Sequence, residues 1–232
     1  MINVQYPFTD LTKALLTLIQ TLKPTDWDKT TLFKNYQISL LITHLLKVHI
    51  DIIAHPHHSF TPNIDNNDTA LTRGFVENQV KEIKEILVKD KKVSQVQYSH
   101  CWLVQQYIRQ ALNNQDLLQR IFYFPFLDAT MNGFVSYYLA VDAEKGTIIK
   151  VEIVGEAGAI WAIEKAKIGW QKTSSAHTAT TTLYLDQQIA WLLFANSLHV
   201  NEIGQYYQII GNKLLGSHFL NMRTTAISQD PL

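Results

Sequence analysis

Apolar residues in the first half of the chain recur at spacings of three and four, which is the period of an amphipathic helix. The pattern predicts helices over residues 8–22, 37–54, 68–89 and 94–113. Pro24 ends the first helix. A fifth helix is predicted between residues 115 and 137, with Pro125 breaking or kinking it. Together these elements indicate a four- or five-helix bundle.

The period changes near residue 146, where "TIIKVEIV" alternates apolar and polar side chains as a half-buried strand does. Further strands are predicted in "AIWAIEK", "IGWQK", "HTATTTLYL" and "QYYQII". Asp186 and Asn212 are suited to cap the helices "QQIAWLLFA" and "KLLGSHFLNMRTTAI". The second half is therefore predicted to be a small α+β domain. The polar stretch "DAEKG" places the boundary so that the domains span residues 1–142 and 143–232.

Composition excludes several classes of protein. The chain has 232 residues, of which 47% are hydrophobic, so it can bury a substantial core. Lysine and arginine together number 20, as do aspartate and glutamate, which gives a formal net charge of zero. This balance lacks the basic footprint of a nucleic-acid-binding protein and the polybasic face that anionic membranes attract.

Cysteine usage and the apolar runs bear on location. Cys101 is the single cysteine, so no intrachain disulfide can form, and a reducing compartment is favoured. We interpret Cys101 as a buried, inert thiol. The start "MINVQYPFTDLTK" lacks the pattern of a signal peptide, and every apolar run is too short to span a bilayer. The sequence thus predicts a cytoplasmic protein.

The candidate chemistry lies in the histidines. On a helical wheel with Ile38 at zero, His49 falls near 20°, in the middle of the apolar face, and His44 falls near 240°, on its flank. Asp51 shares the stripe of His44 but lies about 10 Å away along the axis, so any metal site that uses His44 needs ligands from another helix. His100 is the candidate there, because it shares an apolar stripe with its helix neighbours.

The residues alone leave an alternative open. A histidine on an apolar face is often a hydrogen-bonded core residue, which gives His49 and His100 a structural interpretation. The loop "HPHH" holds His55, His57 and His58, and such surface clusters bind metal adventitiously. The sequence contains no HExxH, no Cys/His pair at zinc spacing, no Gly-rich phosphate loop and no GxSxG.

The stretch "LKPTDWDKTTLFKNYQISLLITHLL" resembles the start of the maleylpyruvate isomerase-like family, part of the DinB helical-bundle superfamily. The matching residues are Leu22, Pro24, Asp26, Trp27, Thr31, Leu32, Tyr36, His44 and Leu45. The stretches "KVEIVGEAGAIWAIEKAKIGWQK", "TTLYLDQQIAWLLFA" and "YYQIIGNKLLGSHFLNMR" resemble that family's C-terminal domain. The resemblance implies an α+β protein: a DinB-like bundle of four or five helices followed by a small sterol-carrier-protein-like domain.

The resemblance also implies a chemistry. Members of the family bind a divalent metal, usually zinc, through a histidine that ends the second helix and a carboxylate and histidine four residues apart on a later helix. His44 matches the first ligand, His100 falls at the carboxylate position, and Val104, which cannot bind metal, falls at the second histidine. A small thiol such as mycothiol then binds as a thiolate. Arg223, in "FLNMR", matches an arginine that holds an anionic substrate.

Two functions are therefore in competition. The first is a metal- and thiol-dependent isomerase or transferase, with His44 and His100 as metal ligands and Arg223 as a catalytic residue. Its partner is a small anionic substrate, with no nucleic acid and no membrane. The second is a metal-free small-molecule-binding protein with a degenerate metal site, whose ligand Tyr36, Trp102 and Arg223 would line.

Overall fold

The computed structural model describes residues 3–54, 93–198, 200–202 and 204–226, together with residues 76, 78, 80, 81 and 83. By its contacts the chain divides into two compact units. Unit 1 is formed by residues 1–117 and 226–232, and unit 2 by residues 118–225. The predicted α+β class is confirmed, since helices form unit 1 and a sheet with helices forms unit 2.

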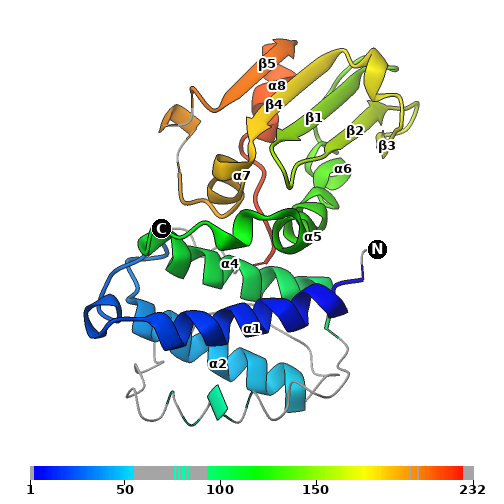
Figure 1. Cartoon of the computed structure of the whole chain (residues 1–232). Helices are drawn as coiled ribbons and strands as arrows, with labels where there is room; N and C mark the ends of the chain where they lie inside the picture. Colours follow the sequence, from blue (N-terminus) through cyan, green and yellow to red (C-terminus); the bar gives the residue numbers. More distant parts are fainter. Residues whose placement is uncertain are drawn as a thin grey trace. The chain divides into compact units, whose positions relative to one another are not determined.

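Long helices run side by side in unit 1 (Figure 1): α1 (Gln5–Thr21), α2 (Ile38–Ala54) and α4 (Gln95–Ala111). Helix α4 packs against both α1 and α2. The apolar positions spaced by three and four are the buried ones, as predicted; in α1 they include Phe8, Leu11, Leu15, Leu18 and Ile19. The DinB identity of this helical unit stays a prediction.

Part of the predicted third helix lies within the described residues. All five described positions between 76 and 83 are helical. Val76, Val80 and Ile83 are buried, whereas Asn78 and Lys81 are exposed, so the apolar repeat faces the core as expected. The remainder of the predicted helix 68–89 lies outside the described residues, as does the "HPHH" loop.

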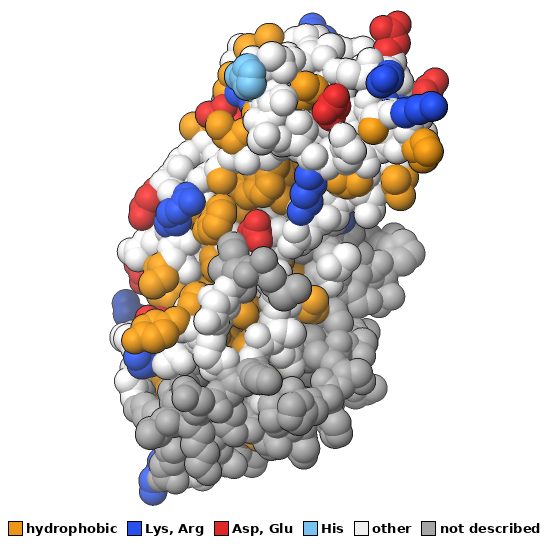
Figure 2. Space-filling model, turned by 90° about the vertical axis from the view of Figure 1, so that its right-hand side faces the viewer, with side chains coloured by type: hydrophobic (Ala, Val, Ile, Leu, Met, Phe, Trp, Pro, Cys, Tyr) orange, Lys and Arg blue, Asp and Glu red, His pale blue; other side chains and the backbone are white. Residues whose placement is uncertain are grey.

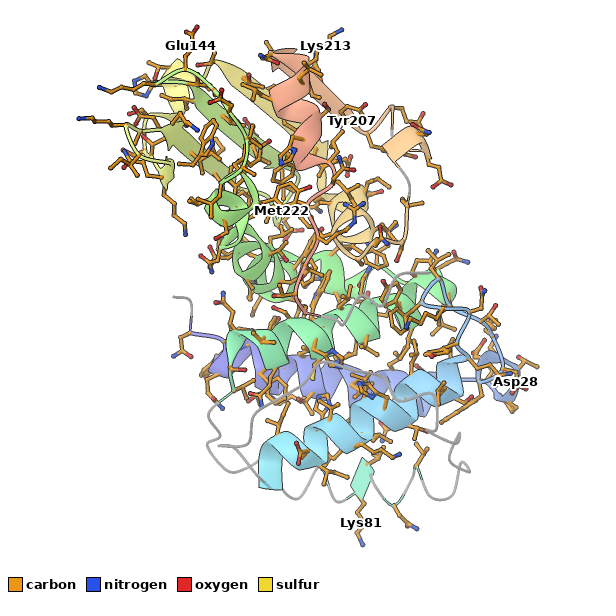
Figure 3. All side chains as sticks on the ribbon, turned by 180° about the vertical axis from the view of Figure 1, so that it is seen from behind. Asp28, Lys81, Glu144, Tyr207, Lys213 and Met222 are labelled. Atoms are coloured by element: carbon orange, nitrogen blue, oxygen red, sulfur yellow. The ribbon has the colours of Figure 1, made fainter. Side chains whose placement is uncertain are left out.

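The segment between α1 and α2 fixes where α2 begins. A short 3-10 turn, η1 (Pro24–Asp26), is followed by a β-bridge that joins Thr30 to Gln37. The amide of Ile38 then donates to the carbonyl of Lys29, at 2.9 Å. Because these bonds set the first turn of α2, they also set the direction of every side chain on it. Figure 3 labels Asp28 in this segment.

Helix α4 is defined at its start and tied to α1 by buried polar groups. Ser94 caps it in a reciprocal pair of hydrogen bonds with Gln97. Gln105 donates to the carbonyl of Leu11 at 3.2 Å, and Arg109 donates to the carbonyl of Ala14 at 3.0 Å. These bonds, made to consecutive turns of α1, hold the two helices in one register.

The predicted fifth helix is divided. Unit 2 begins with α5 (Arg120–Met131) and α6 (Phe134–Tyr137), which are separated at Asn132 and Gly133. Pro125 was predicted to break or kink the helix, and the break is excluded, since α5 continues through this residue. The carbonyl that loses its partner belongs to Ile121, whose residue is 50% exposed and open to hydration. Burial of Pro125 and its neighbours then outweighs the lost bond.

Unit 2 contains a mixed sheet in the order β3-β2-β1-β4-β5. Its strands are β1 (Ile148–Val154), β2 (Ile160–Lys165), β3 (Trp170–Lys172), β4 (Thr181–Asp186) and β5 (Tyr207–Gly211). The central strands β1 and β4 are parallel, and the other neighbours are antiparallel. Alternate residues of β1 and β4 are buried, which confirms the alternation seen in the sequence.

Two helices pack on the sheet: α7 (Gln187–Phe194) on β1 and β4, and α8 (Lys213–Phe219) on β4 and β5 (Figure 1). Both predicted caps are confirmed, because Asp186 accepts from the amide of Gln188 and Asn212 accepts from the amides of Leu214 and Leu215. Lys213 at the start of α8 and Glu144 before β1 lie at the same end of the sheet (Figure 3).

Helices α5 and α6 belong with the sheet. The hydroxyl of Tyr123 donates to the carbonyl of Gln187 at 2.9 Å, and that of Tyr138 donates to the carbonyl of Leu215 at 2.6 Å. The division by contacts at residues 117 and 118 therefore comes earlier than the change in periodicity from which the bounds 1–142 and 143–232 were predicted.

One face of the described surface is mixed in charge. On the face shown in Figure 2, lysine and arginine side chains are scattered among acidic and apolar ones. This agrees with the zero formal net charge of the chain. Among the described residues, no helix is both long enough and apolar enough to cross a membrane.

Gly158, in the turn between β1 and β2, offers a test of the sheet packing. A Cβ at this position would lie 1.8 Å from the carbonyl oxygen of Ile153. We expect Gly158→Ala to lower the free energy of unfolding by about 3 kcal/mol, since a backbone atom cannot yield as a side chain does. Gly204→Ala is the matched control, because a Cβ there meets nothing within 4 Å. Equal midpoints in urea unfolding of the two variants would contradict this packing.

Candidate functional site: two buried histidines

His44 of α2 and His100 of α4 meet inside unit 1. Their Nε2 atoms lie 2.7 Å apart, and the rings are inclined by 70° to each other. His44 is 5% exposed, and His100 is fully buried. The structure thus brings together the two residues that the sequence predicted as metal ligands, from helices more than fifty positions apart.

The hydrogen bonds of His100 determine the tautomers of the pair. The Nδ1 of His100 lies 2.9 Å from the carbonyl oxygen of Ala226. A carbonyl only accepts, so Nδ1 carries the proton, and Nε2 of a neutral ring presents a lone pair. His44 therefore donates its Nε2 proton to His100. The two hydrogen bonds thus run in one direction: His44 donates to His100, and His100 donates to the carbonyl of Ala226.

Burial keeps both imidazoles neutral. Desolvation lowers the pKa of His44 to about 4, and the nearby charge of Lys47 adds to the effect. Desolvation likewise lowers the pKa of His100 to about 3, with His44 as the second cause. Because one proton already bridges the two facing nitrogens, a second would place positive charge in a buried site. Near neutral pH the pair therefore holds a lone pair rather than a charge.

His49 has the structural role that its place on the wheel suggested. Its Nδ1 donates to the carbonyl of Leu45 at 2.7 Å, and its ring stacks on Phe8 with centroids 5.3 Å apart. It is fully buried, and burial lowers its pKa to about 4. The interpretation of His49 as a core residue, separate from the pair, is therefore confirmed.

The donor set around the pair is small. Within the described part of the chain, no group of three or more histidine, cysteine or carboxylate side chains lies close enough to share a metal ion. Val104, one turn after His100, is fully buried and offers no donor atom. Cys101 is also fully buried, as predicted, and burial raises the pKa of its thiol. The described side chains fit a cation with two imidazole ligands and no more.

Arg223 lies in unit 2, after the end of α8, next to Met222, which Figure 3 labels. Its Nε donates to the side-chain oxygen of Asn196 at 2.9 Å, and its Nη1 donates to the carbonyls of Leu220 and Met222. These bonds give the guanidinium a helix-capping role at the end of α8. Nη2 makes no hydrogen bond to any described residue. The catalytic role of Arg223 stays a prediction.

Aromatic side chains elsewhere lie in packed surroundings. The His218 ring packs against Tyr137 and Tyr138, with centroid distances of 4.7 Å and 4.8 Å. Trp102 is fully buried and donates to the carbonyl of Leu117. It is therefore a core residue of unit 1 and does not line an accessible ligand site. Tyr36 is half-buried.

The tryptophans differ in burial. Trp27 and Trp161 are half-buried, whereas Trp170 is buried. Trp161 lies on β2 and stacks with Phe124 of α5, at 6.2 Å between centroids.

The neutral buried histidines predict how stability depends on pH. An unfolded histidine titrates near pH 6.5, whereas His49 in the folded chain titrates at about 4. Between these values the unfolded state binds more protons, so stability is full above pH 6.5 and falls as the pH falls toward 4. His49→Leu should reduce this slope by up to about 1.4 kcal/mol per pH unit in urea titrations from pH 7.5 to 4.5. An unchanged slope would refute the buried neutral state of His49.

Comparisons with known proteins leave the family open. No family model matches the chain, and no curated protein matches it. Its structure is similar to the crystal structure of sterol carrier protein-2 like-3 from Aedes aegypti, at 13% identity. This likeness covers 40% of this chain and 92% of that chain, with a TM-score of 0.28.

Proposed function

We propose that the helical unit binds a divalent cation, with zinc as the first candidate, through His44 and His100. The observation that carries this proposal is the approach of two Nε2 atoms to 2.7 Å from different helices. Zinc–nitrogen bonds of about 2.0–2.1 Å in tetrahedral geometry place two ligand nitrogens about 3.3 Å apart. The two rings would have to separate by only about 0.6 Å, which small side-chain rotations supply.

The electrostatics of the pair favour a metal over a proton. A metal must displace protons from its ligands, so ligands that are already neutral bind it better near pH 7. Burial lowers the pKa of His44 to about 4, which removes the competing charged form. One Nε2 proton, held by His44, would still leave on binding or move to the other nitrogen of that ring.

The surroundings of His100 support this proposal. Histidines that bind a metal through Nε2 usually donate their Nδ1–H to a carboxylate or a backbone carbonyl, which orients the ring. In this chain the carbonyl of Ala226 accepts that bond at 2.9 Å. The same tautomer therefore serves the hydrogen-bonded pair and a metal-bound pair.

For the reaction class, we propose the thiol-dependent isomerase or transferase that the family resemblance implies. The two ligands among the described residues leave coordination positions open, and a bound divalent cation would lower the pKa of a small thiol there. Arg223 is the group proposed to pair with an anionic substrate, since two N–H groups of its Nη2 are not used by described residues.

Metal binding is tested by equilibrium dialysis of untagged protein against zinc, with metal content read by mass spectrometry. We expect close to one zinc per chain in the wild type, and loss of most of it in both His44→Ala and His100→Ala. His49→Leu is the matched control, because it removes a buried histidine of α2 outside the pair and should leave zinc binding unchanged. Circular dichroism melts establish that each variant is folded.

Two results would refute the proposal. The first is a wild type that stays empty at saturating zinc, which would make the pair a structural hydrogen bond. The second is equal zinc loss in His49→Leu and His44→Ala, which would show that general destabilisation causes the loss. If zinc binds, titration of a cobalt-loaded protein with a small thiol tests the reaction class through a thiolate-to-metal absorption band.

A further inference from the structure

We infer that the main-chain carbonyl of Ala226 decides whether the histidine pair can accept a cation, because it fixes the tautomer of His100. This inference rests on the proposed metal site and deepens it. It assigns a positioning group, in the C-terminal part of the chain, to a site built from helices near the N-terminus.

The His100–Ala226 hydrogen bond joins residues that are distant in sequence, and both are buried. His100 and Ala226 are 126 positions apart, yet Nδ1 and the carbonyl oxygen lie at 2.9 Å. Ala226 is 3% exposed and belongs to unit 1, although the residues that precede it, 118–225, form unit 2. Water therefore has little access to either partner, and the carbonyl of Ala226 provides a hydrogen-bond acceptor for His100 Nδ1.

A neutral imidazole carries one N–H, so the two nitrogens of His100 cannot act independently. With Nδ1–H donated to Ala226, Nε2 points a lone pair at His44, which is the form that binds metal. Without the carbonyl, the proton is free to sit on Nε2 instead. That tautomer points an N–H at the site and has no lone pair there for a cation.

The coupling works in both directions. Loss of an outer group that orients a metal-bound histidine typically weakens metal binding by 10–100-fold. Linkage then requires that the cation strengthen the His100–Ala226 contact by the same factor. The physical cause is that a cation on Nε2 makes Nδ1–H a stronger donor. Metal binding by the pair and formation of the His100–Ala226 hydrogen bond are thus coupled equilibria.

The first measurement uses the full metal-free chain. Long-range nitrogen–proton NMR correlations of the imidazoles report which nitrogen of His100 holds the proton. We expect Nδ1–H alone. A ring with its proton on Nε2, or a mixture of both forms, would overturn the inference whatever the metal content of the protein.

The second measurement compares two shortened chains by zinc dialysis. A chain that ends at Thr225 lacks the carbonyl, and its matched control, which ends at Ile227, keeps it. We expect zinc to bind the first 10–100-fold more weakly than the full chain and the second within about twofold of it. Equal affinity of the two would overturn the inference and leave the metal site standing. A full chain that binds no zinc would instead refute the proposed function, and the tautomer measurement would still decide the role of Ala226.

A third measurement holds even if the chain that ends at Thr225 does not fold. A serine carboxypeptidase removes residues from the C-terminus of the full chain, and release of Ala226 is followed with and without zinc. We expect zinc to slow this release at least tenfold in the wild type. It should have no effect in His44→Ala, which keeps the His100–Ala226 bond but loses a metal ligand. Equal release with and without zinc in a wild type that binds zinc would contradict the coupling.

Discussion

One chain of hydrogen bonds, from His44 through His100 to the carbonyl of Ala226, constrains the rest of unit 1. Two buried imidazoles are tolerated only if they are neutral and hydrogen-bonded, since an unpaired polar group or a charge inside a core is costly. The positions of α2 and α4 must therefore agree to within the tolerance of a hydrogen bond. The start of α2 and the bonds of Gln105 and Arg109 to α1 supply that precision.

The sequence predicted the parts of this arrangement that depend on local periodicity. Helical spacing turned His49 and His100 inward, and cap chemistry identified Asp186 and Asn212, because these features arise within one or two turns of chain. The meeting of His44 with His100 depends on how far α2 is rotated against α4, which periodicity does not specify. The acceptor at Ala226 was out of reach, because a main-chain carbonyl has no signal in a sequence.

Where the predictions failed, tertiary packing outweighed a local rule. Pro125 costs α5 one hydrogen bond, but buried neighbours in the same helix keep it continuous. The contacts that bury α5 come from other elements: Phe124 stacks on Trp161 of β2, and the Tyr123 hydroxyl donates to the carbonyl of Gln187. A window of neighbouring residues therefore could not show that the helix continues.

Val104 shows how much the site depends on its outer contacts. It follows His100 by one turn and is fully buried, so the position offers packing where a third imidazole would offer a ligand. A site with three protein ligands can hold a cation even when one ring is poorly oriented. If the pair binds a cation with the two described imidazoles as its ligands, each ring must present its lone pair at the right angle. The orientation of His100 by the carbonyl of Ala226 would then carry more weight than in a three-ligand site.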